Sequence, residues 1–270
     1  MSAGEIRQSL MEIGLYPRKK LGQTFLADDN IADREIAAAA ITRRETVLEI
    51  GPGLGVLTTR LCEVARKVIA IETDDRLVFH LNQLLANRAE VIHGDAMEVE
   101  LPHFDVAVGN LPYSVASQLI FRLSDAGMKR GLFMIQREMA ERVVAPPYTA
   151  EYSRMAAVLQ RSYAVKLLFN VGHSHFYPQP DVDSSVLLFR KRKGVKKWPE
   201  YERAAAILFS QRRKMMASIL RKALPVDSTL DLKSMPYGSS RIEELTVAKI
   251  EKVVSWLLTD AAASRMLRNQ

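Results

Sequence analysis

The sequence predicts an α/β fold with a mostly parallel sheet, followed by a smaller, all-helical C-terminal part. Between residues 31 and 144, short apolar runs alternate with amphipathic helical patterns, which is the order that βα units produce. Gly51, Gly53 and Gly55 follow the first apolar run directly. After residue 190 the chain contains helical patterns and many basic residues. These three observations predict the fold class.

Composition limits the kind of protein. The 270 residues are 48% hydrophobic and 26% charged, which is typical of folded globular proteins. No stretch reaches the ~18–20 apolar residues of a membrane span, and the N-terminus shows no apolar signal segment. Cys62 is the only cysteine, which excludes an intrachain disulfide and a cysteine-rich metal site. We therefore expect a cytoplasmic protein that holds no metal and does not associate with membranes.

The positive charge is concentrated at the C-terminal end. Residues 191–270 carry 17 Lys and Arg against 8 Asp and Glu, a net charge of +9, whereas residues 1–190 have a net charge of −2. We therefore expect a first domain over 1–190 and a basic helical domain over 191–270. Such asymmetry favours a nucleic-acid partner, and a solvated helical face with surplus lysines is the alternative.

The first forty residues predict two helices and a basic segment. Apolar residues at helical spacing predict helices over 5–16 and 31–41. Between them, a basic run at 17–20 leads into the partly apolar segment 21–26, which contains Phe25. This segment is either a surface loop held by one phenylalanine or a cationic strap beside a ligand site.

The glycine turn lies between a predicted strand over 47–50 and a predicted helix over 56–65. Glycine lets the backbone turn tightly and approach a ligand, and this order opens nucleotide-binding α/β units. The next predicted strand, 68–71, ends in Glu72, twenty-one residues after Gly51. A carboxylate at this spacing can accept hydrogen bonds from both ribose hydroxyls. A solvent-facing glutamate is the alternative.

Two further predicted strands end in polar residues. The run 91–92 leads into Asp95, whose carboxylate could accept a hydrogen bond from an adenine amine, although an Asp in a turn needs no function. The strand over 104–108 leads into Asn110-Leu111-Pro112-Tyr113. Since open α/β sheets bind ligands at the carboxyl ends of their strands, we expect both segments beside the glycine turn.

The remaining elements continue the alternation and then change to helices. We expect a helix over 114–125, a strand over 131–135, a helix over 136–144, a loop at 146–148, the end of the sheet over 155–169 and 185–189, a Pro-rich and aromatic loop over 173–184, a basic linker over 191–197, and helices over 200–223 and 246–258. Arg212, Arg213 and Lys214 fall on the first of these last two helices and are candidate RNA-binding residues.

Two common nucleotide chemistries are disfavoured. The dinucleotide fingerprint Gly-x-Gly-x-x-Gly requires glycine where this chain has Val56. Pro52 removes a backbone N–H where a pyrophosphate needs donors. No Gly-Lys-Ser/Thr loop is present, so we do not expect phosphoryl transfer by a P-loop.

The segment from Asn110 to Tyr113 favours chemistry on an adenine amine. The lone pair of that amine is delocalised into the ring, and two acceptors aimed at its hydrogens favour the pyramidal geometry needed for attack. The Asn110 side-chain carbonyl and the Leu111 backbone carbonyl are candidate acceptors, and Pro112 fixes the turn. Tyr113 would stack on an extruded or single-stranded base. An ordinary strand-to-helix turn is the alternative for this segment alone.

These motifs together resemble the ribosomal RNA small-subunit adenine dimethyltransferase family over about residues 10–215. The matching segments are Leu21-Gly22-Gln23-Thr24-Phe25-Leu26, Glu49-Ile50-Gly51-Pro52-Gly53-Leu54-Gly55, Ile71-Glu72, Gly94-Asp95-Ala96-Met97, Asn110-Leu111-Pro112-Tyr113, Gln136-Arg137-Glu138, the loop from Phe176 to Ser184, and Phe209 with Arg212-Arg213-Lys214.

The resemblance implies a Rossmann-like, class I methyltransferase domain that uses S-adenosylmethionine, followed by a small helical domain. It implies transfer of methyl groups to N6 of two adjacent adenosines in a hairpin near the 3′ end of small-subunit RNA, within a pre-30S-type particle, by a monomer. It assigns cofactor contacts to Thr24, Leu26, Gly51, Gly53, Glu72, Asp95 and Asn110, and it places Tyr113 and Phe176 against the target adenine.

Two other functions stay open at the level of the sequence. One is a related enzyme that methylates large-subunit RNA, of the macrolide-resistance type. The other is a ribosome-assembly factor whose catalysis is incidental. The family often has a proline pair where this chain has Gly172-His173-Ser174-His175. The two histidines suggest a metal, but no cysteine lies near and carboxylates follow only after Pro180, so we expect none.

Overall fold

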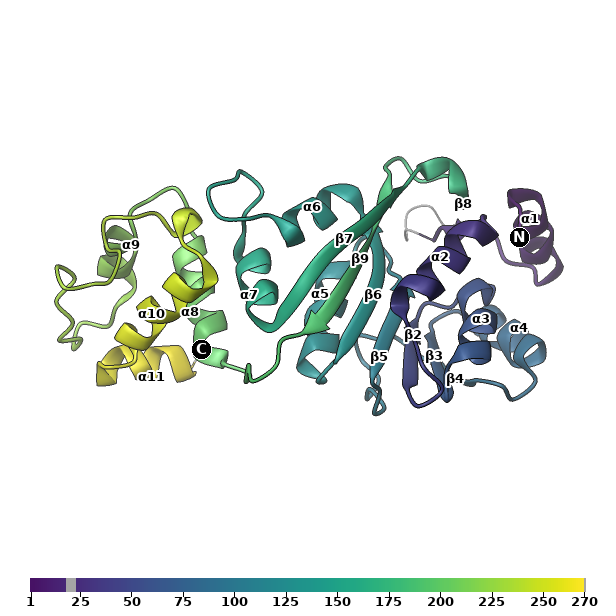
Figure 1. Cartoon of the computed structure of the whole chain (residues 1–270), viewed down its shortest axis with the longest axis horizontal. Helices are drawn as coiled ribbons and strands as arrows, with labels where there is room; N and C mark the ends of the chain where they lie inside the picture. Colours follow the sequence, from purple (N-terminus) through teal and green to yellow (C-terminus); the bar gives the residue numbers. More distant parts are fainter. Residues whose placement is uncertain (18–22, 270) are drawn as a thin grey trace. The chain divides into compact units, whose positions relative to one another are not determined.

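The computed structural model describes residues 1–17 and 23–269 of the chain (Figure 1). They form two compact units, the first of Met1–Ala140 with Lys166–Lys191, and the second of Glu141–Val165 with Arg192–Gln270. The predicted division after residue 190 therefore needs one correction, because the segment 141–165 groups with the C-terminal unit. The basic run at 18–20 lies outside the described residues.

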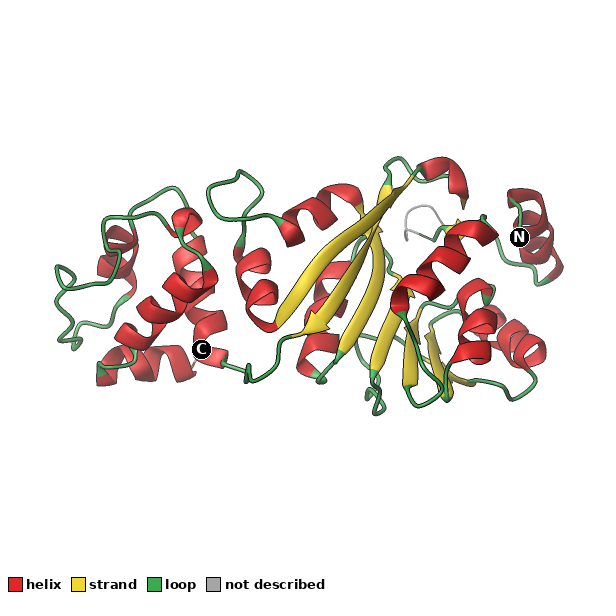
Figure 2. Ribbon diagram, viewed as in Figure 1, coloured by secondary structure: helices red, strands yellow, loops and turns green. Residues whose placement is uncertain are grey.

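The first unit contains a seven-stranded sheet with helices packed on it (Figure 2). Its strands are β2 (Thr46–Ile50), β3 (Lys67–Glu72), β4 (Glu90–His93), β5 (Val106–Asn110), β6 (Arg130–Gln136), β7 (Tyr163–Val171), of which residues 163–165 group with the second unit, and β9 (Ser184–Lys191). A two-stranded sheet joins β1 (Phe25–Leu26) to β8 (Phe176–Tyr177). The helices of this part are α1 (Ala3–Glu12), α2 (Asp29–Ala39), α3 (Val56–Val64), α4 (Asp75–Leu85), α5 (Ala116–Asp125) and α6 (Arg137–Val144), of which α6 continues into the second unit.

The strand order is β4-β3-β2-β5-β6-β9-β7. Strands β2 to β6 are parallel to one another, with Leu48 of β2 opposite Ile69 on one side and Ala107 on the other. Strand β9 is antiparallel to β6. The order of the strands reverses between β2 and β5, and such a switch point opens a crevice at the carboxyl ends of the two strands.

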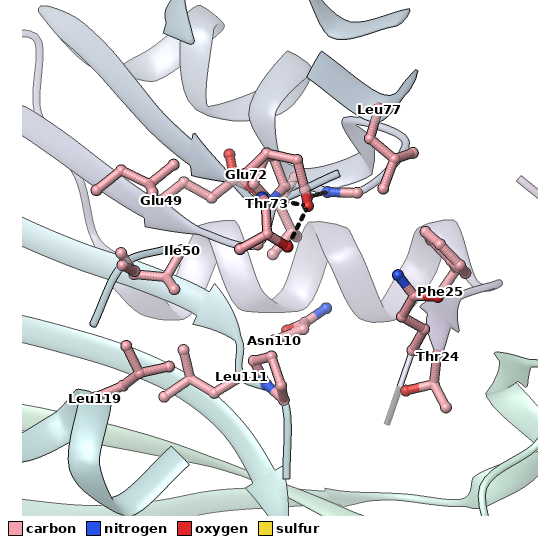
Figure 3. A pocket seen from close by; sticks show the side chains of 18 of the residues that line it. Thr24, Phe25, Glu49, Ile50, Glu72, Thr73, Leu77, Asn110, Leu111 and Leu119 are labelled. Carbon is pink, nitrogen blue, oxygen red and sulfur yellow. Dashed lines mark hydrogen bonds between the residues drawn. The ribbon is translucent and has the colours of Figure 1, made fainter. Parts of the chain in front are cut away.

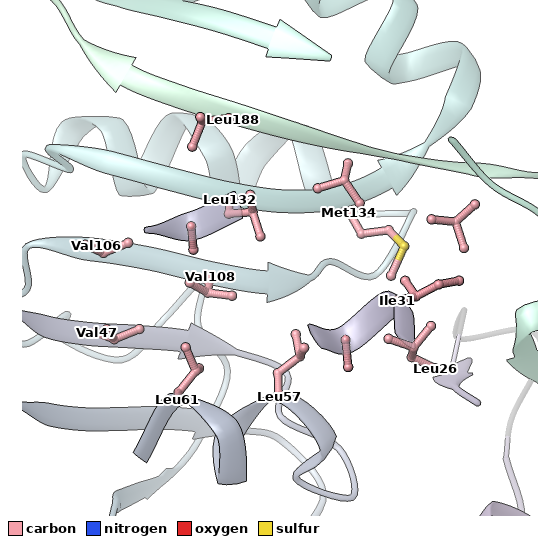
Figure 4. Packing of buried hydrophobic residues seen from close by; sticks show 14 of the residues in the cluster. Leu26, Ile31, Val47, Leu57, Leu61, Val106, Val108, Leu132, Met134 and Leu188 are labelled. Carbon is pink, nitrogen blue, oxygen red and sulfur yellow. The ribbon is translucent and has the colours of Figure 1, made fainter. Parts of the chain in front are cut away.

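Burial of apolar side chains holds the sheet and its helices together. Strands β2, β3 and β5 are buried along almost their whole length, as expected where helices cover both faces of a parallel sheet. One core cluster joins Val47 and Val108 of the sheet to Ile31 of α2 and to Leu57 and Leu61 of α3 (Figure 4). Burying each Leu or Ile side chain contributes roughly 1.5–3 kcal/mol, so this cluster fixes α2 and α3 against the strands that carry the glycine turn.

The second unit is mainly helical. Its helices are α7 (Arg154–Ser162), α8 (Pro199–Phe209), α9 (Met216–Ala223), α10 (Val247–Leu257) and α11 (Ala261–Asn269), with a short 3-10 turn η3 (Ile242–Glu244). Helix α8 contacts α7, α9, α10 and α11. The buried Tyr201 donates its hydroxyl hydrogen to the Ala157 carbonyl at 3.2 Å, and Tyr152 donates to Leu245 at 3.0 Å. These bonds pair buried hydroxyls that would otherwise be costly.

Two predicted elements differ from the structure. The segment 155–169, expected at the end of the sheet, begins as α7 and only then becomes β7. The helix expected over 200–223 is interrupted between Phe209 and Met216. Arg212, Arg213 and Lys214 therefore lie in a turn and not on a helix. The expected parallel strands and their helices agree with the structure to within a few residues at their ends.

Candidate active site

A cavity of about 330 Å³ opens at the carboxyl ends of β2, β3 and β5, next to the switch point. All of its lining residues belong to the first unit. Figure 3 shows three groups of side chains around it, near the ends of β3, β5 and β1: Glu72 and Thr73, Asn110 and Leu111, and Thr24 and Phe25. The chain therefore brings residues from distant positions to one concave site, which is the usual form of a small-molecule site.

The glycine turn forms one wall of the cavity. Gly51, Gly53 and Gly55 all have positive φ angles, between 57° and 82°, a conformation that other residues adopt only with strain. A Cβ on Gly53 would lie 3.1 Å from the Phe25 ring. Gly55 is the N-cap of α3. The prediction that this turn needs glycine at alternate positions is confirmed.

Glu72 is held at the end of β3 by backbone donors. Its Oε2 accepts a hydrogen bond from Gly53 N–H at 3.1 Å, and its Oε1 accepts from the N–H groups of Thr73 at 2.8 Å and Asp74 at 3.1 Å. The side chain is 6% exposed and lines the cavity. A carboxylate has about four acceptor positions, so Oε2 keeps capacity for a ligand hydroxyl. The alternative of a solvent-facing glutamate is wrong.

Asn110 ends β5 and lines the same cavity. Its Oδ1 atom is buried and has no hydrogen-bond partner among the described residues, and such an unpaired acceptor marks a site that a ligand can complete. The next residue, Leu111, donates its N–H to the Met134 carbonyl at 3.0 Å, and Val115 N–H closes a turn onto the Pro112 carbonyl at 3.1 Å. The backbone around Asn110 is thereby fixed.

Gly109 makes this placement possible, and the sequence reasoning missed it. A Cβ at Gly109 would lie 2.7 Å from the Ile50 carbonyl oxygen. Any larger residue would therefore separate β5 from β2 at the point where the cavity opens. The only sequence signal was a glycine inside an apolar strand, which often marks a close backbone approach.

Tyr113 is positioned by its hydroxyl. Its oxygen lies 2.7 Å from Ser184 Oγ at the start of β9. Partial burial raises the pKa of the Tyr113 phenol, and the contact with Ser184 opposes that rise. Asn110, Leu111 and Pro112 line the cavity, whereas Tyr113 does not. The hydrogen bond fixes the ring next to the turn that carries the candidate acceptors.

The predicted site residues in and near strands β1 and β8 lie in different places. Thr24 and Leu26 line the cavity, and their contact with the cofactor stays a prediction. Phe176 pairs with Leu26 across the β1–β8 ladder, is 3% exposed and packs in the core cluster with Ile31 and Val171. Its ring therefore faces the core and does not line the cavity. Contact between Phe176 and a target base stays a prediction.

Asp95 also reaches the cavity, on the loop after β4. Its Oδ1 accepts a hydrogen bond from Met97 N–H at 2.7 Å, as in an Asx turn. The structure therefore shows the turn role of Asp95. A carboxylate that orders its own loop still presents a second oxygen, and the contact of Asp95 with a cofactor stays a prediction.

Two buried carboxyls beside the site were not predicted to be functional. Burial, together with repulsion from Glu49, raises the pKa of Glu35 on α2 to about 8, and the Asn110 side chain opposes that rise. Burial raises the pKa of Glu49 to about 8 as well; Thr58 opposes the rise and Glu72 adds to it. Both Glu35 oxygens lack a hydrogen-bond partner among the described residues. Their only sequence signal was an acidic residue within an apolar pattern.

The two histidines of the 172–175 segment pair with carboxylates. His173 Nδ1 lies 2.9 Å from Asp183 Oδ1, and His175 Nδ1 lies 2.8 Å from Asp28 Oδ2. Asp28 is also the N-cap of α2. In the part of the chain that the structure describes, no group of three His, Cys, Asp or Glu side chains is placed to hold a metal ion. No helix there has both the length and the apolar character to span a membrane.

Arg212 makes contacts within the second unit, and its predicted contact with RNA stays a prediction. Its Nη1 donates to the carbonyls of Ala150 at 2.6 Å and Tyr152 at 2.9 Å, and its Nε lies 3.6 Å from Glu243. These contacts within the second unit explain the turn that interrupts the predicted helix. Arg213 and Lys214 in the same turn are exposed.

The residues of the cavity fit a nucleoside that carries a cationic sulfur. The Glu72 carboxylate can accept hydrogen bonds from ribose hydroxyls. The glycine turn lets a ligand lie close to the backbone, and the unpaired Asn110 oxygen can accept a hydrogen bond from a polar group of the ligand or of the target. Leu54, Leu57 and Leu77 complete the lining with apolar surface. Fold and site together define the class of Rossmann-like methyltransferases that use S-adenosylmethionine.

Comparison with known proteins narrows this class to one family. The family described as "Ribosomal RNA adenine dimethylase" matches residues 15–258. The chain belongs to this family. A "Probable ribosomal RNA small subunit methyltransferase A" from Thermococcus onnurineus is 35% identical over 92% of this chain and 95% of its own length. A "Ribosomal RNA small subunit methyltransferase A" from Thermotoga maritima is 34% identical over 89% of this chain and 85% of its own.

Solved structures agree with the fold. A dimethyladenosine transferase from Plasmodium falciparum has a TM-score of 0.77 and is 29% identical, covering 85% of this chain and 95% of its own. The 23S rRNA methyltransferase ErmE has a TM-score of 0.67 at 23% identity, covering 86% of this chain and 98% of its own. The second similarity concerns the fold alone. The predicted α/β, Rossmann-like methyltransferase fold is confirmed.

Proposed function

We propose that this protein transfers methyl groups from S-adenosylmethionine to N6 of two adjacent adenosines in the 3′-terminal hairpin of small-subunit ribosomal RNA. The observation that carries the proposal is the position of Asn110. Its unpaired Oδ1 lies in the same cavity as Glu72 and the glycine turn, at the carboxyl edge of a switch-point sheet. One cavity thus has groups for a ribose and an acceptor for an amine.

When bound, S-adenosylmethionine supplies an electrophilic methyl group on a sulfonium sulfur. Glu72 Oε2 accepts hydrogen bonds from the ribose hydroxyls, since three backbone N–H groups already fix its carboxylate. Asp95 accepts from the adenine amine of the cofactor. Gly51 and Gly53 allow the protein backbone to pass close to the amino-acid end of the cofactor. Thr24, Leu26 and Asn110 line the remaining side of the cavity.

The target adenosine enters at the rim beside Asn110. Asn110 Oδ1 and the Leu111 carbonyl accept hydrogen bonds from the N6 hydrogens, which directs the nitrogen lone pair toward the methyl carbon. Pro112 keeps the Leu111 carbonyl in place. Tyr113, held by Ser184, stacks on the base. The bound S-adenosylmethionine would supply the methyl group, and N6, held by Asn110 and the Leu111 carbonyl, would take it and release one proton to water. Positioning carries most of the rate enhancement.

The basic second unit contacts RNA phosphates in this proposal. Lys193 and Lys196 of the linker are exposed, as are Arg213 and Lys214. We propose a monomer that acts on a pre-30S-type particle in the cytoplasm. RNA affinity is then expected to fall steeply with salt, because each neutralised phosphate releases counterions.

Two alternatives from the sequence are less well supported. Methylation of large-subunit RNA has a structural neighbour, but its identity to this chain is 23%, whereas relatives at 34–35% identity are named for the small subunit. An assembly role with incidental catalysis can coexist with the enzyme, since a basic domain can hold RNA without turnover.

The direct test offers purified 30S-type particles and large-subunit RNA to the protein with labelled S-adenosylmethionine. We expect label in small-subunit RNA and N6,N6-dimethyladenosine by mass spectrometry. Asn110→Ala is expected to abolish the label while the protein stays folded. Label confined to large-subunit RNA would reject the proposed substrate, and calorimetry without any heat of S-adenosylmethionine binding would reject the proposed reaction.

A further inference from the structure

The loop over residues 172–183 lies between β7 and β9 and contains the short strand β8. It begins with two histidines, His173 and His175, whose rings lie against the carboxylates of Asp183 and Asp28. No proline occurs between 172 and 176, so hydrogen bonds and packing define the backbone there. The reaction described above uses neither imidazole ring, which leaves both pairs without an assigned role.

His175 joins β1 and β8 to helix α2. The two strands have two residues each, and a ladder of this length is marginal by itself. His175 extends it by one position, because its carbonyl accepts a hydrogen bond from Ala27 N–H at 2.7 Å. Its Nδ1 lies 2.8 Å from Oδ2 of Asp28, and Oδ1 of Asp28 caps α2. The ladder is thereby fixed to a helix that packs on the sheet.

Strand β1 forms part of the wall of the cofactor cavity. Thr24, Phe25 and Leu26 all line the cavity (Figure 3). The Phe25 ring lies so close to Gly53 that a Cβ on this glycine would be 3.1 Å from it. A shift of β1 away from α2 would therefore change the shape of the cavity beside the glycine turn. The contact between His175 and Asp28 opposes that shift.

His173 closes the other end of the same loop. Its backbone N–H and its Nδ1 lie 3.0 Å and 2.9 Å from Oδ1 of Asp183. The Asp183 carbonyl accepts a hydrogen bond from the N–H of Arg137, the first residue of α6, at 2.9 Å. Ser184 follows directly, is buried, and lies 2.7 Å from the Tyr113 hydroxyl. His173 therefore holds the residue that precedes the partner of Tyr113.

The charge of the two carboxylates makes Nδ1 the donor in both pairs. Partial burial raises the pKa of Asp28, and its hydrogen bonds with the Ile31 N–H and His175 lower the pKa by more. The contacts with His173 lower the pKa of Asp183. Both groups are thus ionised at neutral pH and only accept hydrogen bonds. The amide nitrogen of asparagine can take about the place of Nδ1, whereas that of glutamine reaches about the place of Nε2.

We propose that His173 and His175 are positioning residues for the methyl transfer and act at opposite ends of one loop. His175 holds β1 in the wall of the cofactor cavity and so determines affinity for S-adenosylmethionine. His173 holds the end of the loop where Ser184 fixes the Tyr113 ring, and so determines turnover. The role of His173 rests on the proposed function, whereas the role of His175 concerns cofactor binding alone.

The role of His175 is tested by titration calorimetry with S-adenosylmethionine. His175→Ala is expected to weaken affinity about fivefold, the size of one net hydrogen bond. His175→Asn restores a donor at the place of Nδ1 and is expected to bind within about twofold of the original protein. His175→Gln, with its donor displaced, is expected to bind as weakly as His175→Ala. His103→Ala, at an exposed histidine in the loop before β5, is expected to leave affinity unchanged.

The role of His173 is tested by kcat on purified 30S-type particles at saturating S-adenosylmethionine. His173→Ala is expected to lower kcat about threefold, because the backbone N–H at 173 still bonds to Asp183. Its cofactor affinity is expected to stay within about twofold of the original, and His173→Asn is expected to restore kcat. In Tyr113→Phe, which lacks the hydroxyl that Ser184 holds, His173→Ala is expected to cause no further loss.

Several results would overturn the inference. Unchanged cofactor affinity in His175→Ala, or equal affinities of His175→Asn and His175→Gln, would reject the role of His175. The comparison of Asn with Gln decides this point even where the Ala variant does not fold, which thermal melts detect. Unchanged kcat in His173→Ala, no recovery in His173→Asn, or the same loss in the Tyr113→Phe background would reject the role of His173.

Failure of the proposed function is distinguishable from these results. An original protein that binds S-adenosylmethionine but methylates no small-subunit RNA would reject the proposed function, and the calorimetric comparison of the His175 variants would still hold. A protein that methylates the particles with the same kcat in His173→Ala would reject the role of His173 and leave the proposed function intact.

Discussion

Glu72 Oε2 accepts a 3.1 Å hydrogen bond from the backbone N–H of Gly53. This bond joins the end of β3 to the glycine turn after β2, across two strands that are already paired. The carboxylate proposed to hold the ribose therefore also sets the turn that lies beside the ligand. The proposed ligand contact and the turn conformation therefore depend on the same side chain.

Glu72→Ala is expected to lower affinity for S-adenosylmethionine at least tenfold, because charged hydrogen bonds contribute about 1.5–3 kcal/mol. Glu72→Gln keeps one acceptor oxygen but places an NH₂ group near backbone donors, so an intermediate loss is expected. Titration calorimetry measures both. Glu90→Gln, an exposed carboxylate that pairs with Lys67, serves as the control, and an equal loss there would count against a specific role for Glu72.

Tyr113→Ala is expected to reduce methylation much more than cofactor binding, since Tyr113 lies outside the cofactor cavity. Tyr113→Phe keeps the ring and loses only the contact with Ser184, a change worth about 1 kcal/mol. It is expected to retain most activity with a modest fall in kcat. Equal losses of cofactor binding and turnover in Tyr113→Ala would contradict the stacking role.

Glu35→Gln is expected to make folding less sensitive to alkaline pH. The Glu35 pKa rises from an ordinary 4.5 to about 8 through burial and the Glu49 charge, against the opposing effect of Asn110. Between these two values the folded state holds more protons than the unfolded state, so this group lowers stability as pH increases. The uncharged variant lacks that cost and is expected to be more stable at pH 8 by about 1–3 kcal/mol.

The measurement is urea unfolding at pH 5 and at pH 8, compared between the variant and the original protein. The gain is expected at pH 8 and not at pH 5. Glu45→Gln is a suitable contrast, because the paired Arg130 and the Thr42 N–H lower the pKa of Glu45 despite partial burial. A gain of the same size at both pH values would show that Glu35 acts through packing and not through its charge.

Asp28→Ala is expected to destabilise the protein by about 1 kcal/mol through loss of the α2 cap. Partial burial raises the pKa of Asp28. Hydrogen bonds with the Ile31 N–H, His175 and the Asn30 N–H lower the pKa by more, so it lies below its ordinary value. The stabilisation that depends on its charge is present above the unfolded pKa and is lost as pH falls through the lowered one. Thermal melts from pH 3 to pH 7 measure this, and a pH-independent difference would contradict it.

Much of the site could be predicted because local chemistry determines it. Glycine at three alternate positions after an apolar run leaves few backbone alternatives, and the positive φ angles of Gly51, Gly53 and Gly55 agree. Parallel strands deliver their last residues to one edge, which places Glu72, Asp95 and Asn110 around one cavity. Order along the chain was sufficient for these positions.

Other features depended on contacts between distant segments. The burial of Phe176 follows from the pairing of β1 with β8, 150 residues apart at the Leu26–Phe176 position. The interruption between α8 and α9 accompanies the bonds from Arg212 to the backbone at 150 and 152. Helical periodicity alone could not show either contact.

By itself, the sequence determined the class of fold, the glycine turn and the polar residues at the strand ends, because short-range spacing and backbone sterics control them. Only the tertiary structure decided which charges are buried and which basic residues face solvent. Glu35, Glu49 and Arg212 owe their environments to residues far along the chain, and desolvation and pairing depend on what surrounds a group in space and not on its neighbours in sequence.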